Sequence, residues 1–243
     1  FPNVPAKAFR VKQNAYPQIN AAFVAPEYVI NTAKQSPLMK GCSLGILDEA
    51  VDMEANRPRD TKALRKELQI DDDKLVFVCV AKLNQPSKGA SYFIEAARKL
   101  ENDPRLVFIH IGHNSKYPKP LPANLITKGY VNNQDELSQY YSMADLFVFA
   151  SVLDTMPNTC LEALGCGSPL LCFDVSGMPY LGDSSVMTLV ESRNVDAMVE
   201  VIRHTKKKTQ ETIDTCRAYA LKRYDVKEYS RKLVSTMNNL KNK

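Results

Sequence analysis

Short apolar runs separated by amphipathic segments recur along most of this chain of 243 residues. The run LVFVCV, which begins at Leu75, is almost continuously apolar, as is typical of a strand buried on both faces of a parallel sheet. Further runs follow at 105–112, 125–131, 145–151, 168–175 and 186–191. Helical patterns lie between them, near 92–100, 133–144 and 194–203. This alternation predicts an α/β fold built on a doubly wound, Rossmann-like parallel sheet, with the ligand at the carboxyl ends of the strands.

The most informative segment is DTMPNTCLEALGCGSPLLCFD at 154–174, which joins a loop, a short helix and a buried strand. Pro157 suits the start of a helix, because a residue without an N–H group loses no hydrogen bond there. The residues able to cap or end this helix are Asn158, Thr159, Gly165 and Gly167. The N–H groups of the first turn would face the carboxyl edge of the sheet, where they and the helix dipole favour a phosphate.

Two carboxylates, Asp154 and Glu162, flank this predicted phosphate site. Direct contact with a phosphate would be repulsive, so we expect both to accept hydrogen bonds from hydroxyl groups of a sugar or a ribose. A purely structural interpretation is also open. Thr159 and Glu162 have the spacing of a capping box, and Asp154 could simply cap a turn.

A second loop, within LVFVCVAKLNQPSKGASYFIEAARKL at 75–100, carries Lys82 and Lys88 between a strand and an amphipathic helix. Two lysines at the carboxyl end of a parallel strand are well placed to hold a diphosphate. As mobile point charges they can follow the negative charge that builds on a leaving group. The structural alternative for either lysine is an ordinary solvated loop charge.

Together the two segments resemble the retaining glycosyltransferases of family 4, which have the GT-B fold. The family signature is an acidic residue, seven further residues and Glu, followed by A-hydrophobic-A-C-G-x-P. Here Asp154 takes the acidic position, and the run continues as Glu162-Ala-Leu-Gly-Cys-Gly-Ser-Pro169. The family's other loop carries a basic pair six residues apart. Lys82 and Lys88 keep that spacing, with Lys82 in place of the usual Arg.

The resemblance implies a role for each matching residue. The lysines and the backbone at the start of the helix would hold the donor diphosphate. Glu162 would accept from the ribose hydroxyls, Asp154 would meet the transferred sugar, and the segment KGYV at 128–131 would pack against the nucleobase. The implied catalytic residues are Lys82, Lys88 and Asp154, and the implied donor-binding residues are Gly112, Tyr130, Val131, Asn158, Thr159, Cys160 and Glu162. For His113 a partly exposed loop position is favoured, with a ligand role as the alternative.

The reaction implied by the resemblance is transfer of a sugar from a nucleoside diphosphate sugar to a saccharide or lipid-linked acceptor, with retained anomeric configuration. Neither a cofactor nor a metal is expected, because lysines and a helix dipole neutralise the diphosphate. Residues 23–240 match only the latter half or so of a full enzyme. We therefore expect a remnant of the acceptor domain and crossover at 1–58, the donor-binding domain at 59–225 and a basic helix at 226–243. The isolated chain is expected to bind donor weakly and to transfer nothing.

Composition restricts the cellular location and the kinds of partner that we expect for the protein. No run approaches the roughly 18 apolar residues of a membrane span, and the N-terminal stretch lacks the apolar region of a signal peptide, so we expect a cytoplasmic protein. Its six cysteines form no metal-binding pattern, and Cys79 and Cys172 lie in apparent buried strands. Residues 203–243 contain twelve basic and four acidic side chains, a net charge of +8. A solvated helical face is the first interpretation, peripheral contact with the inner face of a membrane is the second, and nucleic acid is not expected.

Two rival functions remain open. One is a nucleotide-sugar epimerase of the GT-B fold, which should need dedicated histidines and carboxylates around the sugar; the chain has only three histidines. The other is a non-catalytic module that binds nucleotide sugars for regulation or assembly. A nicotinamide or flavin dinucleotide site is not expected, since no G-x-G-x-x-G follows any of the predicted strands.

Overall fold

The computed structural model describes residues 4–113, 117 and 119–241. The chain divides into two units, which are described separately. The larger unit is Ala50–Glu228, and the smaller joins Phe1–Glu49 to Tyr229–Lys243. The domain boundaries expected from the sequence, at 58/59 and 225/226, remain predictions.

A sheet of six parallel strands organises the larger unit, in the order β5-β4-β3-β6-β7-β8. The α/β fold with a doubly wound parallel sheet is therefore confirmed. The strands are β3 Leu75–Val80, β4 Leu106–Ile111, β5 Leu125–Lys128, β6 Leu146–Phe149, β7 Leu170–Asp174 and β8 Met187–Glu191.

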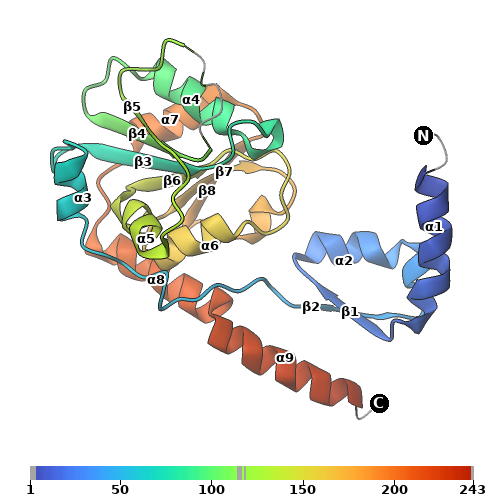
Figure 1. Cartoon of the computed structure of the whole chain (residues 1–243). Helices are drawn as coiled ribbons and strands as arrows, with labels where there is room; N and C mark the ends of the chain where they lie inside the picture. Colours follow the sequence, from blue (N-terminus) through green and yellow to red (C-terminus); the bar gives the residue numbers. More distant parts are fainter. Residues whose placement is uncertain (1–3, 114–116, 118, 242–243) are drawn as a thin grey trace. The chain divides into compact units, whose positions relative to one another are not determined.

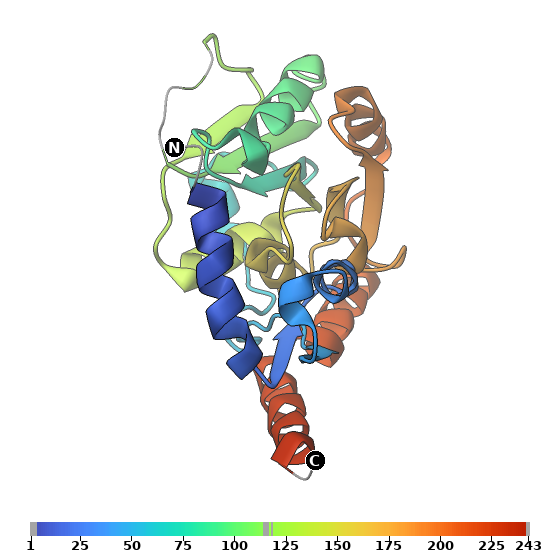
Figure 2. The ribbon, with the colours of Figure 1, turned by 90° about the vertical axis from the view of Figure 1, so that its right-hand side faces the viewer.

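Helices cover both faces of this sheet (Figure 1). α4 and α7 pack together on one face, and α5, α6 and α8 lie on the other, as the turned view of Figure 2 also shows. The helices of the larger unit are α3 Lys62–Glu67, α4 Ala90–Lys99, α5 Gln134–Met143, α6 Asn158–Gly165, α7 Val195–His204 and α8 Gln210–Tyr224. Short 3₁₀ turns are η3 Pro86–Lys88 and η4 Met178–Tyr180.

The alternation of side chains along β3 explains how one apolar run supplies two cores. Phe77 and Cys79 join the core beneath α4 and α7, where Phe77 stacks on Phe108 with ring centroids 5.1 Å apart. Val76 and Val78 point to the opposite face and are also fully buried. Each large side chain buried in this way contributes about 1.5–3 kcal/mol to folding. The prediction that Cys79 is a small apolar core residue is therefore confirmed.

The direction of winding reverses between β3 and β6. From β3 the chain adds β4 and β5 on one side, then returns to pair β6 with the other side of β3, through Phe77 with Leu146 and Val78 with Phe147. The helices that follow β3 and β6, α4 and α6, consequently lie on opposite faces of the sheet. Such a switch point is where parallel α/β sheets bind their ligands.

The strands after β3 are shorter than the runs in the sequence indicate, and in two of them the difference affects site residues or their neighbours. The strand expected at 145–151 is β6 Leu146–Phe149, because Ala150 and Ser151 leave the sheet to contact the loop after β3. The strand expected at 125–131 is β5 Leu125–Lys128. Tyr130 and Val131 therefore belong to a loop rather than to a strand.

The smaller unit contains one parallel pair of strands, in which Ala21 is opposite Ser43 and Val24 is opposite Ile46. Its elements are α1 Val4–Ala15, η1 Tyr16–Gln18, β1 Ala21–Val24, α2 Glu27–Lys34, η2 Pro37–Met39 and β2 Ser43–Ile46. α9 Val226–Lys241 begins in the larger unit and continues into the smaller one. Within the part of the chain that the structure describes, none of the helices has both the length and the apolar character needed to cross a bilayer.

Candidate functional site

Lys88 and Asp154 meet at the switch point of the sheet. Lys88 ends the 3₁₀ turn in the loop after β3, and Asp154 lies in the loop after β6. The Lys88 Nζ atom donates a hydrogen bond of 2.5 Å to Asp154 Oδ2. The side chains are 33% and 16% exposed, so the pair is sheltered but open to solvent on one side. Two of the residues singled out from the sequence are thus brought into direct contact.

Backbone contacts between the two loops fix this pair. The Ser151 hydroxyl donates to the Ser87 carbonyl oxygen at 2.8 Å, and the Val152 N–H donates to the same oxygen at 2.9 Å. Gly89 follows Lys88 with φ +74°, and a Cβ atom placed on it would lie 1.7 Å from the Ala150 carbonyl oxygen. Only glycine therefore allows the loops to approach this closely without strain.

The start of α6 differs from the sequence prediction. Asn158 and Thr159 were expected to cap the helix, but they are its first two residues, and the N-cap is Pro157, which has no side chain able to accept. The alternative interpretation of Thr159 and Glu162 as a capping box is wrong, because Pro157 takes the N-cap position and the Glu162 carboxylate bonds elsewhere. The Cys160 N–H donates to the Pro157 carbonyl oxygen at 3.0 Å. The N–H groups of Asn158 and Thr159, which we expect to face a phosphate, stand at the very start of the helix. They have no carbonyl group one turn earlier to donate to, and they have no acceptor among the described residues.

Glu162 is oriented by a tyrosine from the neighbouring helix. The Tyr141 hydroxyl, on α5, donates to Glu162 Oε2 at 2.8 Å. Burial raises the pKa of the Glu162 carboxyl above its usual value, and the hydrogen bond from Tyr141 lowers it in opposition. Burial and the neighbouring carboxylate raise the pKa of Tyr141 well above 10, so this phenol remains a donor. One carboxylate oxygen is thus held by the protein, leaving Oε1 to accept from another group.

A third loop, after β7, supports the backbone of Asp154. The Gly177 N–H and the Ser176 hydroxyl both donate to the Asp154 carbonyl oxygen, at 2.9 and 2.7 Å. A Cβ atom on Gly177 would lie 1.5 Å from the Thr155 carbonyl oxygen. Asp154 Oδ1 also accepts from the Thr155 N–H at 2.9 Å. Asp154 is therefore held from both its main chain and its side chain.

The other expected site residues lie around the loops after β3, β4 and β5. Lys82 is exposed just beyond β3, and Gly112 is buried at the end of β4, where its N–H donates to the Lys128 carbonyl oxygen at 3.3 Å. Tyr130 is 64% exposed and stacks on the exposed ring of His113, with centroids 5.2 Å apart and ring planes 11° apart. Val131 is half-buried. The side chain of Cys160 is fully buried, so only its main chain could face a ligand.

Sequence reasoning missed Tyr141 and Ser151 as parts of this arrangement. Tyr141 lies in the helical pattern near 133–144, and its buried ring packs against Phe147. A tyrosine at a buried position needs a partner for its hydroxyl, which was the available signal. Across the described ranges 4–113, 117 and 119–241, no group of three or more His, Cys, Asp or Glu side chains is placed to hold a metal ion.

Known proteins resemble this chain in sequence and in structure. The glycosyltransferase TuaC of Bacillus subtilis (strain 168), named for teichuronic acid biosynthesis, is 29% identical over 143 residues, covering 57% of this chain and 35% of the relative. The structure of sucrose-phosphate synthase from Thermosynechococcus elongatus matches with a TM-score of 0.78 at 14% identity, covering 97% of this chain and 62% of that one. Anabaena Alr3699/HepE in complex with UDP-glucose matches with a TM-score of 0.68 at 18% identity, covering 89% and 63%.

The structural likenesses, at such low identity, show the fold alone. The chain spans only 32–41% of the length of the first curated relatives that it matches. The family model described as glycosyl transferases group 1 matches residues 60–223, which is more than half of the chain and contains every expected site residue. The chain therefore belongs to the glycosyl transferases group 1 family.

Proposed function

We propose that this chain supplies the donor-binding part of a glycosyltransferase that moves a sugar from a nucleoside diphosphate sugar to a saccharide or lipid-linked acceptor. The observation that carries the proposal is the Lys88–Asp154 pair at the switch point, beside the uncapped start of α6. Cationic, hydroxyl-accepting and amide-donating groups meet there, and these are the groups that a diphosphate joined to a sugar requires.

Each group has a proposed contact on the donor. The diphosphate lies against the amides of Asn158 and Thr159, with Lys88 and Lys82 neutralising its charge. Glu162 Oε1 accepts from a ribose hydroxyl while Tyr141 holds the other oxygen. The nucleobase rests by the loop that carries Tyr130 and Val131, next to Gly112. Asp154 accepts from hydroxyl groups of the transferred sugar.

The proposed chemistry retains the anomeric configuration and uses no metal. Two lysines and the dipole of α6 supply the positive charge that stabilises the departing diphosphate. A double displacement would need a carboxylate nucleophile beside the anomeric carbon. Asp154 is the nearest acid at this edge, but its carboxylate is occupied by Lys88 and the Thr155 N–H. We therefore favour attack by the acceptor on the same face from which the diphosphate leaves.

In this proposal the acceptor binds to the part of the whole protein that lies outside this chain. The chain alone therefore binds donor weakly and transfers nothing. Measurable transfer of radiolabelled sugar by the isolated chain would overturn that part.

A peripheral contact with anionic lipid is assigned to α9, which exposes Val234 and Met237 along with Arg231 and Lys232. Co-sedimentation with phosphatidylglycerol vesicles, lost in a Val234→Ser, Met237→Ser variant, tests this contact.

The donor site is tested by calorimetric titration of the chain with UDP, GDP, ADP and their common sugar conjugates. UDP-glucose is the first conjugate to try, because one solved neighbour was crystallised with it. Lys88→Ala should weaken binding of the preferred nucleotide by about tenfold or more, since it removes a charge-assisted hydrogen bond. Glu162→Gln should weaken it by a smaller factor.

Lys99→Ala is the matched control for this titration. Lys99 also forms an ion pair, with Asp196 at 2.7 Å, but it ends α4 and so lies toward the opposite edge of the sheet. Binding should be unchanged in this variant. If no nucleotide binds saturably, or if Lys99→Ala weakens binding as much as Lys88→Ala, the donor-site assignment is wrong.

A further inference from the structure

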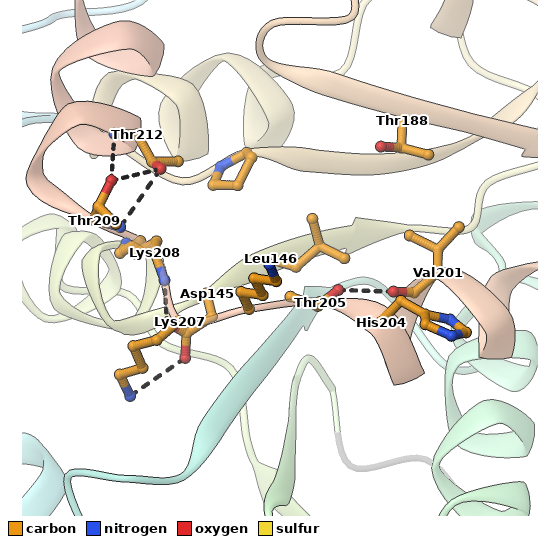
Figure 3. A pocket seen from close by; sticks show the side chains of 12 residues that line it. Asp145, Leu146, Thr188, Val201, His204, Thr205, Lys207, Lys208, Thr209 and Thr212 are labelled. Atoms are coloured by element: carbon orange, nitrogen blue, oxygen red, sulfur yellow. Dashed lines mark hydrogen bonds and ion pairs between the residues drawn. The ribbon is translucent and has the colours of Figure 1, made fainter.

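A cavity of about 630 Å³ lies in the larger unit (Figure 3). Its walls come from the first residues of β6 and β8, the residue before β7, the end of α7 and the segment that leads into α8. The lining residues are Asp145, Leu146, Pro169, Thr188, Val201, His204, Thr205, Lys206, Lys207, Lys208, Thr209 and Thr212. Its volume falls within the range of small-molecule sites in proteins.

This cavity is separate from the proposed donor site. Leu146 begins β6, Pro169 precedes β7 and Thr188 is the second residue of β8, so the cavity opens at the amino edge of the parallel sheet. The Lys88–Asp154 pair lies beyond the carboxyl ends of the strands. At ~3.3 Å per residue, a strand of four to six residues keeps the two places at least ~13 Å apart.

Three consecutive lysines make the cavity cationic. Lys207 Nζ lies 3.5 Å from Asp145 Oδ2 and donates to the Lys74 carbonyl oxygen at 2.6 Å. Lys208 directs its ammonium to the Ser168 hydroxyl, at 2.9 Å. Lys206 is exposed and has no acceptor among the described residues. Against these three positive charges the lining contains a single carboxylate, that of Asp145.

The one carboxylate is already saturated by the protein. Asp145 Oδ2 accepts from the Val76 N–H at 2.9 Å, and Oδ1 accepts from the Lys208 N–H at 3.1 Å. Its side chain is almost wholly buried, and Figure 3 shows Lys207 and Lys208 both joined to it. Because these bonds hold the lysine segment against β3 and β6, the position of Lys206 in the cavity lining follows from the fold. The excess positive charge remains for a ligand.

The remaining donors are hydroxyl groups and an imidazole. Thr188 is exposed, and its hydroxyl is unbonded among the described residues. His204 Nδ1 lies 2.8 Å from the Glu200 carbonyl oxygen, which leaves Nε2 on the outer side of the ring. A compact anion with several acceptor oxygens matches a lining that offers both an ammonium and a hydroxyl from different elements.

The geometry points to a second ligand site in this cavity, for a phosphate group, carried either by free phosphate or by a phosphorylated sugar. Lys206, from the segment before α8, and Thr188, from β8, bind the phosphate, and Lys207 contributes charge. Occupation ties the segment before α8 to β8, and therefore stabilises the amino edge of the sheet. This site does not depend on the proposed donor function.

The site is tested by measuring the amide chemical shifts of the full chain during two separate titrations, one with inorganic phosphate and one with glucose 6-phosphate. Chloride keeps the ionic strength constant in both. Saturable shifts at Thr188 and Thr205 are expected. Lys206→Ala should weaken the affinity by roughly tenfold, the effect of removing a charge-assisted hydrogen bond. Tighter binding of glucose 6-phosphate than of phosphate identifies the sugar phosphate as the ligand, and equal binding identifies free phosphate.

Two control variants keep the test specific. Lys222→Ala removes one exposed lysine of α8 outside the cavity lining and so changes the net charge equally. Lys88→Ala disables the proposed donor site. Neither should alter phosphate binding at Thr188. The proposal is overturned if the shifts at Thr188 and Thr205 do not saturate, or if Lys222→Ala weakens them as much as Lys206→Ala does.

Discussion

The ammonium group of Lys88 lies 2.5 Å from the carboxylate of Asp154, although 66 residues separate them in sequence. In the absence of ligand the lysine charge is therefore already compensated. In the proposed donor complex, an incoming diphosphate would compete with Asp154 for Lys88, and a sugar hydroxyl that approaches Asp154 would loosen the same pair. We therefore expect the pair to couple recognition of the two halves of the proposed donor.

Replacing the carboxylate should separate those two effects. We expect Asp154→Asn to bind UDP severalfold more tightly, because Lys88 no longer has to leave an anionic partner. In the same variant the ratio of the affinity for UDP-glucose to the affinity for UDP should fall about tenfold, since a charged hydrogen-bond acceptor is removed. Calorimetry with both ligands measures the two constants. Asp196→Asn, which breaks the exposed pair with Lys99, is the control, and equal changes in both variants would contradict the coupling.

Tyr141→Phe should destabilise the protein by about 1–3 kcal/mol, because the buried Glu162 carboxylate loses its donor. The folded-state pKa of Glu162 is raised by burial, so the folded protein binds more protons than the unfolded chain between the unfolded and folded pKa values. Stability contributed by this group therefore falls as pH rises through that window. Without Tyr141 the pKa should rise further. The stability gap between wild type and variant should then widen from pH 4 to pH 7 in urea unfolding, and a constant gap would refute the proposed role.

The contribution of Lys208 to the free energy of unfolding should change with pH in the opposite direction, and it should do so in alkaline solution. Burial lowers its pKa from the ordinary 10.5 to about 8. Between those values the unfolded chain binds more protons than the folded protein, so stability from this group rises with pH across that interval. Lys208→Met has no such titration. The difference in unfolding free energy, wild type minus variant, should increase from pH 8 to pH 10.5, and a flat difference would show that the ammonium is not desolvated.

Gly177→Ala should impair both stability and nucleotide binding. The new methyl group would lie 1.5 Å from the Thr155 carbonyl oxygen, so the loop after β7 must withdraw from Asp154. Overpacking of this kind typically costs about 1–3 kcal/mol. We also expect weaker UDP-glucose binding, because the Gly177 N–H no longer supports the Asp154 carbonyl oxygen. Gly41→Ala is the comparison: no atom lies within 4 Å of its added methyl group, and its φ of +88°, unlike the negative φ of Gly177, means that it reports backbone strain without a steric clash.

The sequence predicts the scaffold well, because the features that define it are local. The strand at Leu75 and the amphipathic helix near 92–100 both form as expected, and Cys172 is buried in β7. Parallel strands bring their carboxyl ends to one edge, so the placement of Lys88 and Asp154 at a common edge follows from the pattern.

What the sequence does not reveal is decided by tertiary contacts. The hydroxyl of Tyr141 finds Glu162 only because α5 and α6 pack side by side. The uncapped start of α6 arises because Pro157 takes the N-cap position, although Asn158 and Thr159 are better capping residues. The cavity at Lys206 joins the starts of strands that are dispersed along the chain. None of these relationships has a periodicity that could be recognised beforehand.

β3 leaves the ribosome well before β6, yet the two strands are neighbours in the finished sheet. A nascent chain that has ordered only β3, β4 and β5 would keep one edge of β3 open and would have no residue to pair with Lys88. Under the proposed function, the donor site would therefore be complete only once β6 pairs with β3. A nucleotide present during synthesis would selectively stabilise the chains that have completed this closure, so the ligand would also act as a folding sensor.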